Sequence, residues 1–296
     1  MRKLAALLLL LVILSGCAQT PVQPSIPTAA SDAEYLMVHF IDVGQADCAL
    51  LVCGEDAMLI DGGNRADGMA VTRYLQQVGV DALDLVVGTH PHEDHIGGLA
   101  TVLDHIPTET VWTGEIGYTN STVTNFLNAA AGQGAPARQP ELGDTFALGD
   151  AVITVLGPVQ TGYTDVNDLS LVLMVEYFDT RFLFTGDMEQ LAEGDMLDYW
   201  GEDFNWHADV LKIGHHGSYS STGYRLLREV APTWGVISCG YQNEYGHPHD
   251  GPLSRLRDAE VTIFRTDYMG TVIAASDGET IAFAWENGAY TPAIPQ

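Results

Sequence analysis

The sequence has 296 residues and is strongly acidic, with 39 Asp and Glu residues against 12 Lys and Arg residues and a formal net charge of −27. Lys212 is the only lysine after Lys3, and no cluster of Lys and Arg appears. The chain therefore lacks the basic stripe by which proteins normally hold nucleic-acid backbones. We attribute most of the negative charge to solubility.

The N-terminal segment predicts export. Met1-Arg2-Lys3 is a short basic head, residues 4–13 are apolar throughout, and Leu14-Ser15-Gly16-Cys17 follows. This pattern is typical of a signal peptide over residues 1–16, and its end resembles a bacterial lipobox. That resemblance implies cleavage before Cys17, diacylation of its sulfur, and a lipoprotein at the outer face of the bacterial cytoplasmic membrane. The alternative is an ordinary export signal or a membrane anchor, but the apolar run is short for a bilayer core of about 30 Å.

The rest of the chain divides into three parts. Residues 17–33 are rich in Pro, Ala, Ser, Gln and Thr and are expected to form a flexible tether. Residues 34–290 alternate apolar strands with amphipathic segments without a clear break. That length favours one large α/β domain over two. Residues 291–296 remain as a tail.

The predicted elements begin with strands and later mix strands with helices. In chain order we expect strands at 34–43, 47–52 and 57–60, a helix at 68–78, a strand at 83–87, and helices at 96–104 and 121–131. There follow strands at 151–156, 169–177 and 181–184, a helix at 189–199, a strand at 209–213, a helix at 222–230, a strand at 234–239, a helix at 252–259, and strands at 261–264, 270–275 and 280–285. Two sheets packed face to face with helices outside would satisfy this order.

One run carries more chemical information than any other, His90-Pro91-His92-Glu93-Asp94-His95, directly after an apolar strand. His and Asp are the side chains that hold catalytic divalent metals. Pro91 keeps His90 out of the helical region, so a loop can direct His90 and His92 to one point. Asp94 and His95 can then reach a neighbouring point. Two metals about 3.5–4 Å apart can share a water and stabilise an oxygen-centred transition state.

Later strands also end in possible ligands. The strand at 181–184 leads to Asp187 after a glycine, which offers a carboxylate that could bridge two metals. The strand at 209–213 leads to His215 and His216. The alternative is that these histidines are ordinary core residues without a metal. The downstream motifs make that alternative a poor explanation.

These motifs establish a family resemblance. The chain resembles the metallo-β-lactamase fold and, within it, the metallo-hydrolase domain of the ComEC/Rec2 DNA-uptake (competence) proteins. Phosphorylcholine esterases of some bacterial surfaces look similar too. The matching runs occur in the family's order and cover nearly the whole domain, at residues 40–47, 59–63, 89–98, 167–173, 185–187, 215–218 and 246–249.

The resemblance implies an α/β fold of the αββα type, a four-layer sandwich. It also implies ligands at the strand ends: His90 and His92 for the first metal, Asp94, His95 and either His215 or His216 for the second, and Asp187 as the bridge. We favour His215 because it stands nearest the strand end, while the spacing leaves His216 open.

One departure from the family concerns the first metal. Many members of the wider superfamily place another histidine between the His90–His95 run and the bridging Asp. Here only His105 lies in that interval, and we expect it to be structural, on the following helix. The first metal would then be held by two imidazoles, Asp187 and water. Zn²⁺ is the expected cofactor at both sites, with Mn²⁺ as the alternative.

The chemistry of a metal site suggests roles for the remaining residues. The expected nucleophile is a hydroxide held on metal, since a divalent ion lowers the pKa of its water to about 7. Asp94 would also accept a proton, and His247 would be a second catalytic residue on the substrate side. Others are expected to support the ligands or contact substrate, with turn or loop chemistry as the alternative for each: Asp47, Asp61, Asn167, Ser170, Ser218 and His249.

The sequence therefore predicts an exported, membrane-tethered hydrolase with two metals, acting on a phosphodiester. The substrate would be nucleic acid or a cell-surface polymer such as one with a choline phosphate or teichoic-acid linkage. The DNA-uptake resemblance favours nucleic acid, and the acidic charge disfavours it. Two alternatives stay open, a hydrolase of carboxylic esters or amides and a non-catalytic or weakly catalytic lipoprotein that binds a partner.

Overall fold

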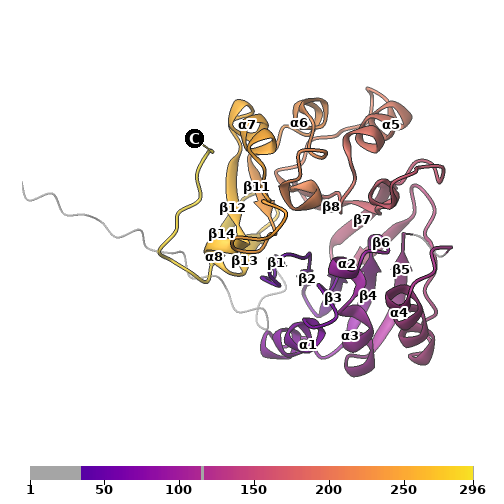
Figure 1. Cartoon of the computed structure of the whole chain (residues 1–296). Helices are drawn as coiled ribbons and strands as arrows, with labels where there is room; N and C mark the ends of the chain where they lie inside the picture. Colours follow the sequence, from indigo (N-terminus) through magenta and orange to yellow (C-terminus); the bar gives the residue numbers. More distant parts are fainter. Residues whose placement is uncertain (1–34, 115–116, 296) are drawn as a thin grey trace, which may run out of the picture.

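Two seven-stranded sheets form the centre of the protein (Figure 1). The computed structural model describes residues 35–114 and 117–295. The predicted signal peptide and tether, including Cys17, lie outside the described residues. Within the described residues, no helix is long and apolar enough to cross a membrane.

The first sheet has the strand order β14-β13-β1-β2-β3-β4-β5. Its strands are β1 (Leu36–Phe40), β2 (Ala49–Cys53), β3 (Asp56–Ile60), β4 (Leu83–Gly88), β5 (Thr108–Thr113), β13 (Val272–Ser276) and β14 (Ile281–Trp285). β3, β4 and β5 run parallel, whereas the other neighbours are antiparallel. Parallel pairing places the carboxyl ends of β3 and β4 at the same edge of the sheet.

The second sheet has the order β12-β11-β10-β9-β8-β7-β6. Its strands are β6 (Thr145–Leu148), β7 (Ala151–Gly157), β8 (Val172–Tyr177), β9 (Thr180–Phe184), β10 (Val210–Lys212), β11 (Trp234–Ile237) and β12 (Thr262–Arg265). β9 to β12 are parallel to one another. The carboxyl ends of β9 and β10 therefore lie side by side, as those of β3 and β4 do in the first sheet.

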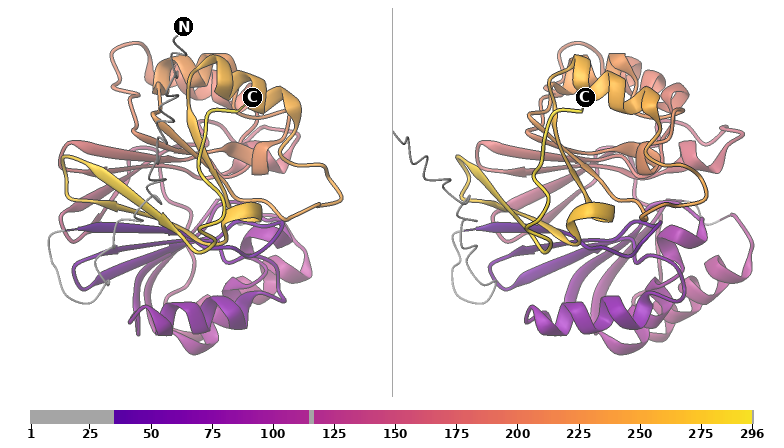
Figure 2. Two further views of the ribbon diagram at one scale, coloured as in Figure 1. Left: turned by 90° about the vertical axis from the view of Figure 1, so that its left-hand side faces the viewer. Right: turned by 60° about the vertical axis from the view of Figure 1, so that its left-hand side comes forward.

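Helices cover the outer face of each sheet (Figure 2). The first sheet is covered by α1 (Gly68–Gln77), α3 (Leu99–His105) and α4 (Ser121–Gly132), and the second by α5 (Gln190–Trp200), α6 (Tyr224–Val230) and α7 (Asp250–Asp258). Short helical turns complete the fold, namely α2 (Glu93–Ile96), α8 (Thr266–Met269), and the 3-10 turns η1 (Val166–Leu169) and η2 (Gly214–Gly217). The predicted four-layer αββα sandwich is confirmed.

Strands of the first sheet are apolar on both faces because both faces are covered. In β2, Ala49, Leu51 and Cys53 pack in the core between the sheets. Leu50 and Val52 face the other way and pack with the helices. Such near-continuous burial is typical of sheets with a layer on each side. It explains why β2 is visible in the sequence as an uninterrupted apolar run.

The structure adds two strands that the hydrophobic pattern does not indicate. β5 contains three threonines and a glutamate but is fixed by parallel pairing with β4. β6 is mostly exposed and pairs with β7 at the edge of its sheet. Ala293, in the segment that the sequence assigns to a tail, forms an antiparallel bridge with Ile263.

Several predicted elements have different limits in the structure, and two of them show a physical reason. The helix expected at 96–104 is two helices, α2 and α3, separated by Gly97 and Gly98. A Cβ on Gly98 would lie 2.1 Å from the carbonyl oxygen of Gly62, so the chain approaches itself too closely for a side chain. The strand expected at 169–177 begins only at Val172, because η1 occupies the preceding residues.

We predict that Leu173→Ala destabilises the fold by about 2–5 kcal/mol, because Leu173 is fully buried between the sheets and its truncation leaves a cavity. The free energy of unfolding from denaturant titration measures the effect. Val152→Ala on the neighbouring strand is the control, since Val152 is 41 % exposed. It should change the free energy of unfolding by about 0.5 kcal/mol or less. Equal losses for the two variants would contradict the assignment of the core.

Candidate metal centre

The candidate site lies where strands of both sheets end. Residues 90–95 follow β4 of the first sheet, and Asp187 follows β9 of the second. Residues 215–216 follow β10, whose carboxyl end is next to that of β9. Ligands predicted from segments far apart in the sequence therefore meet at one edge of the sandwich, the usual place for a site in layered α/β folds.

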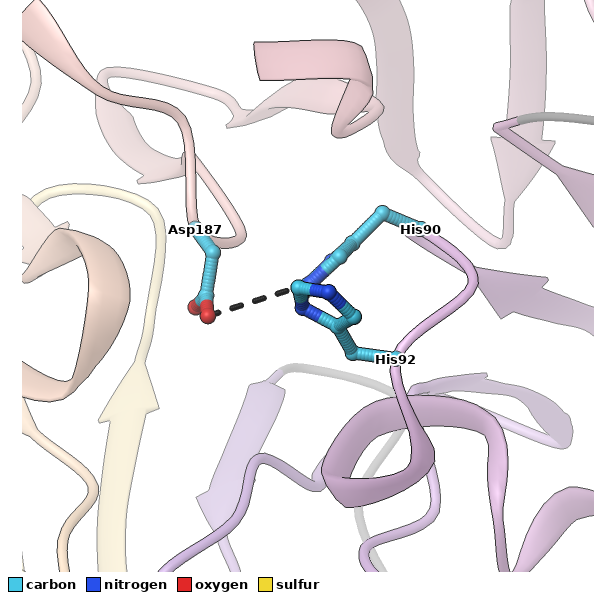
Figure 3. Close-up of side chains that lie close together, drawn as sticks. All are labelled: His90, His92 and Asp187. Atoms are coloured by element: carbon cyan, nitrogen blue, oxygen red, sulfur yellow. Dashed lines mark hydrogen bonds and ion pairs between the residues drawn. The ribbon is translucent and has the colours of Figure 1, made fainter. Parts of the chain in front are cut away.

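His90, His92 and Asp187 form a first group of possible metal ligands. Figure 3 shows both histidine side chains extending from the loop after β4, with Asp187 facing them from the second sheet. His90 Nε2 lies 3.0 Å from His92 Nδ1 and 3.8 Å from Asp187 Oδ2. One donor atom of each residue lies within 4.8 Å of the other two, which is close enough for one ion to contact all three.

Asp94, His95 and His216 form a second group. His216 Nε2 is 3.3 Å from Asp94 Oδ2. Asp187 Oδ2 lies 3.2 Å from His95 Nε2 and 3.7 Å from His216 Nε2, so the same carboxylate faces both groups. This is the geometry expected of a carboxylate that bridges two ions.

The structure places His216, rather than the favoured His215, in the second group. Both residues have positive φ angles, 47° for His215 and 52° for His216. Two successive left-handed residues redirect the backbone, and His216 becomes buried while His215 stays partly exposed. His215 Nδ1 lies 3.2 Å from Glu189 Oε1, and its Nε2 lies 3.7 Å from Asp187 Oδ2. Nearness to the strand end therefore favours His215 as the ligand, whereas burial and the grouping with Asp94 and His95 favour His216.

The electrostatics of the two groups suit cations. Burial lowers the pKa of His216, but Asp187 and then Asp47 outweigh burial and raise that pKa to about 10. The buried Nε2 atoms of His95 and His216 and the Oδ1 atom of Asp187 have no hydrogen-bond partner among the described residues. Converging nitrogen and carboxylate donors without partners fit divalent ions such as Zn²⁺ or Mn²⁺.

Asp61 supports His95 from behind. Its Oδ2 lies 2.8 Å from His95 Nδ1 and accepts a hydrogen bond from Thr89 Oγ1 at 2.7 Å. Its Oδ1 accepts from the Thr89 backbone N–H at 2.8 Å. A carboxylate at Nδ1 fixes the imidazole tautomer that leaves Nε2 free for a metal. Asp61 also has a φ angle of 58° at the end of β3, so it serves the turn and the histidine together.

Asp47 stands behind His216 in a similar way. Its Oδ1 lies 3.3 Å from His216 Nδ1, which also contacts the carbonyl oxygen of Ser238 at 3.0 Å. Its Oδ2 forms an ion pair with Lys212 Nζ at 2.8 Å. Each histidine of the second group therefore has a buried carboxylate behind it.

A cavity of about 260 Å³ opens in front of the ligands. It is lined by Gln45, His92, Glu93, Asp94, Asp187, His215, His216, Tyr245 and His247. The predicted ligands on its wall and the predicted catalytic residues Asp94 and His247 thus share one space. His90 and His95 lie deeper, where both are almost fully buried.

The tautomer of His247 follows from its neighbour Gln45. Gln45 Oε1 accepts a hydrogen bond from the Gly240 backbone N–H at 3.0 Å, and Gln45 Nε2 lies 3.2 Å from His247 Nδ1. Since the amide oxygen is engaged elsewhere, the amide NH₂ donates to Nδ1 and the ring proton is assigned to Nε2. Burial, followed by the charge of His216, lowers the pKa of His247 to about 4, which keeps this imidazole neutral near pH 7.

Ser170 and Asn167 lie beside the cavity and not on its wall. Ser170 Oγ accepts a hydrogen bond from the backbone N–H of Asp187 at 3.0 Å, so it fixes the bridging residue. Asn167 Nδ2 lies 3.5 Å from Glu189 Oε1, the carboxylate that contacts His215. Both residues thus hold the second-sheet side of the site in place.

Ser218 and His249 also contact atoms of the surrounding loops. Ser218 Oγ lies 3.0 Å from Ser220 Oγ. His249 uses both ring nitrogens on backbone groups, because Nδ1 accepts from the Tyr219 N–H at 3.1 Å and Nε2 donates to the Tyr245 carbonyl at 3.1 Å. The structure therefore gives His249 a role in shaping the cavity mouth, which leaves no ring nitrogen for a substrate.

Several residues of the site are not evident from the sequence alone. They are Gln45, Glu93 and Tyr245 on the cavity wall, Glu189 beside His215, and Lys212 beside Asp47. Glu189 had one usable signal, its position two residues after the bridging Asp187. His105, expected to be structural, ends α3 with its Nδ1 2.8 Å from the Thr101 carbonyl oxygen and belongs to neither ligand group.

Comparison with known proteins gives matches in sequence. Residues 41–241 match the Metallo-beta-lactamase superfamily. ComE operon protein 3 of Bacillus subtilis (strain 168) is 29 % identical over 264 residues, which cover 83 % of this chain and 33 % of that protein. Competence protein ComA of Neisseria gonorrhoeae is 30 % identical over 232 residues, which cover 78 % of this chain and 31 % of that protein. The chain thus spans about a third of the length of these relatives.

Solved structures share the fold at low sequence identity. The metallo-beta-lactamase fold protein YhfI from Bacillus subtilis has a TM-score of 0.50 and 12 % identity, covering 77 % of this chain and 96 % of that one. CmlA, a diiron beta-hydroxylase from Streptomyces venezuelae, has a TM-score of 0.50 and 13 % identity, covering 78 % and 53 %. These likenesses show the fold alone. With its four-layer sandwich, and with the family match extending over most of the domain, the chain belongs to the metallo-β-lactamase superfamily.

Proposed function

We propose that this protein is a phosphodiesterase that uses two divalent metal ions, most simply Zn²⁺, with Mn²⁺ as the alternative. The observation that carries the proposal is that two ligand groups face the shared carboxylate of Asp187 beside one cavity. Two ions held there would polarise a phosphoryl oxygen and lower the pKa of a water. Such a pair suits phosphate esters because charge develops on several oxygens in their transition state.

The side chains on the substrate side support this chemistry. His247 carries its proton on Nε2 and is positioned to donate a hydrogen bond from it to a phosphoryl oxygen. His215 is oriented by Glu189, whose Oε1 also accepts a hydrogen bond from Ser220 Oγ at 2.7 Å. Asp94 is part of the second group and is 32 % exposed toward solvent, so it can also accept a proton from the attacking water.

The proposed substrate is a phosphodiester in a nucleic-acid strand or a cell-surface polymer. The cavity of about 260 Å³ has room for the phosphodiester and one neighbouring group. Tyr245 lines this cavity and is 60 % exposed, so its ring offers that group an apolar face. The net charge of −27 opposes binding of a long polyanion, which favours a short or single-stranded substrate.

The proposed location is the outer face of the bacterial cytoplasmic membrane, with the domain tethered through a lipid on Cys17. The support is the signal-peptide pattern and the Leu14–Cys17 run, both in the segment outside the described residues. A tether of residues 17–33 would let the domain reach substrates near the surface without entering the bilayer.

We predict that the purified protein contains about two divalent ions per chain and that Asp187→Ala lowers the content to below one, because both groups lose their shared carboxylate. Elemental analysis by mass spectrometry after dialysis measures the ions and identifies the metal. Asp203→Ala removes an exposed carboxylate that belongs to neither ligand group and is the control that should keep both ions. Retention of two ions by Asp187→Ala would contradict the bridge.

We predict turnover of at least one of three phosphodiesters, bis-p-nitrophenyl phosphate, single-stranded DNA or p-nitrophenyl phosphorylcholine. His247→Ala should lower kcat/KM by about 10²-fold while leaving the metal content unchanged, because His247 acts on the substrate and not on the metals. The relative rates on the three substrates separate nucleic acid from surface phosphodiesters. If the protein binds two ions but hydrolyses none of the three substrates, the phosphodiesterase proposal is wrong and a partner-binding lipoprotein is favoured.

We predict that Cys17→Ala abolishes lipid attachment and releases the domain from membranes, since the thiol is the only attachment point that the lipobox offers. Metabolic labelling with a fatty acid and fractionation of cells measure both effects. Cys48→Ala is the control, because Cys48 is a buried core thiol and its loss should leave the label in place. A Cys17→Ala protein that stays in the membrane fraction would instead indicate an uncleaved anchor.

A further inference from the structure

Lys212 is a buried cation next to the metal centre. Its side chain is about 5 % exposed, and its Nζ lies 2.8 Å from Asp47 Oδ2 and donates to the Ile213 carbonyl oxygen at 3.0 Å. A buried ammonium is costly unless it is paired and hydrogen-bonded. The chain has only one other lysine, Lys3, so this placement is a specific feature of the site and not part of a general basic surface.

Asp47 connects this ammonium to the second ligand group. One carboxylate oxygen pairs with Lys212, and the other lies 3.3 Å from His216 Nδ1. The backbone N–H of Asp47 donates to the carbonyl oxygen of Asp94 at 3.1 Å. Asp47 therefore touches two residues of the second group, and Lys212 contacts the carboxylate oxygen of Asp47 that does not face His216.

The ion pair bears on which side of His216 can take a metal, together with the Ser238 carbonyl oxygen, which lies 3.0 Å from His216 Nδ1. Asp47 belongs to two further clusters with ligand-like spacing, one with Asp187 and His216 and one with Asp61 and His95. The Lys212 ammonium already occupies the cation position at Asp47. A divalent ion placed there would meet a like charge, whereas the cavity side of His216 has no lysine or arginine on its wall.

We propose that Lys212 is a positioning residue that acts through Asp47 on His216 and confines metal binding to the cavity side of that imidazole. The inference rests on the metal centre of the proposed function but not on its substrate. It predicts that loss of Lys212 lowers the metal affinity of the second group and leaves that of the first group unchanged. In the first group, His90 Nδ1 meets the neutral hydroxyl of Thr89 at 3.2 Å and not a carboxylate paired with a lysine.

The sign of the change in metal affinity distinguishes a positioning role of Lys212 from a purely electrostatic one. Removal of an ammonium near a metal would by itself strengthen cation binding, because a like charge is lost. A loss of affinity in Lys212→Met can therefore not come from electrostatic repulsion. It would report that Asp47 no longer orients His216, an outer contact whose loss typically weakens metal binding by 10–100-fold.

The experiment isolates the second group in a His92→Ala background, which removes an imidazole of the first group. Zn²⁺ and Co²⁺ are titrated into the metal-free full-length chain by calorimetry, and the visible absorption of Co²⁺ reports the ligand geometry. We expect Lys212→Met to raise the Kd about 10–100-fold and to alter the Co²⁺ spectrum. Arg181→Met is the matched control, since it breaks the Arg181–Glu176 ion pair of the same sheet and should leave Kd and spectrum unchanged. An equal or lower Kd for Lys212→Met would overturn the proposal.

A second variant covers the case in which Lys212→Met does not fold with Asp47 unpaired. Asp47→Ala/Lys212→Met removes both charges and keeps the net charge, and neutral replacements of a buried pair are often tolerated. We expect the same 10–100-fold loss for this double variant, because both substitutions interrupt one contact. Wild-type affinity in the folded double variant would overturn the proposal. Both readouts are metal affinities, so a failure of the phosphodiesterase assay would leave the result intact.

Discussion

The candidate site depends on one buried carboxylate oxygen, Asp187 Oδ2. The Nε2 atoms of His90, His95, His215 and His216 lie between 3.2 and 3.8 Å from it and come from loops of both sheets. Burial alone would raise the pKa of Asp187, but the charges of His95 and His216 outweigh burial and hold that pKa well below its usual range. A carboxylate in this position requires positive charge around it. That requirement explains both the converging imidazoles and the fit to divalent ions.

The fold meets this requirement through the ends of parallel strands. Asp187 is the third residue after β9 and follows Gly186, which has a φ angle of 51°. A Cβ at Gly186 would lie 2.9 Å from the Ser170 side chain, so the glycine lets the loop pass close to the serine that fixes the Asp187 backbone. The apolar core between the sheets keeps β4 and β9 at a constant separation. A small shift of either loop would therefore change the distances between the Asp187 carboxylate and the imidazoles.

The parts that could be predicted from the sequence are those that depend on local spacing. The His90–His95 run and Asp187 are recognisable because each follows an apolar strand, and the sandwich follows from the order of strands and helices. Strand β5 does not stand out in the sequence because it contains three threonines and a glutamate and is fixed by pairing with β4. The choice of His216 over His215 depends on two positive φ angles, which spacing does not reveal. The Lys212–Asp47 contact joins distant segments and is visible only when both sheets are in place.

The two ligand groups differ in the side chains that contact the Nδ1 atoms of their histidines, and this difference adds to the absence of a third histidine in the first group. In the second group, Asp61 contacts His95 Nδ1 at 2.8 Å, while His216 Nδ1 lies 3.0 Å from the Ser238 carbonyl oxygen and 3.3 Å from Asp47 Oδ1. A negative charge near Nδ1 raises the basicity of a ligating imidazole. In the first group, His90 has a neutral hydroxyl in that place. The Asp187 carboxylate is also the only negative charge of the first group, and it is shared. An ion in the first group is therefore held more weakly than an ion in the second group. Its affinity depends on how strongly the Asp187 carboxylate also binds the ion of the second group.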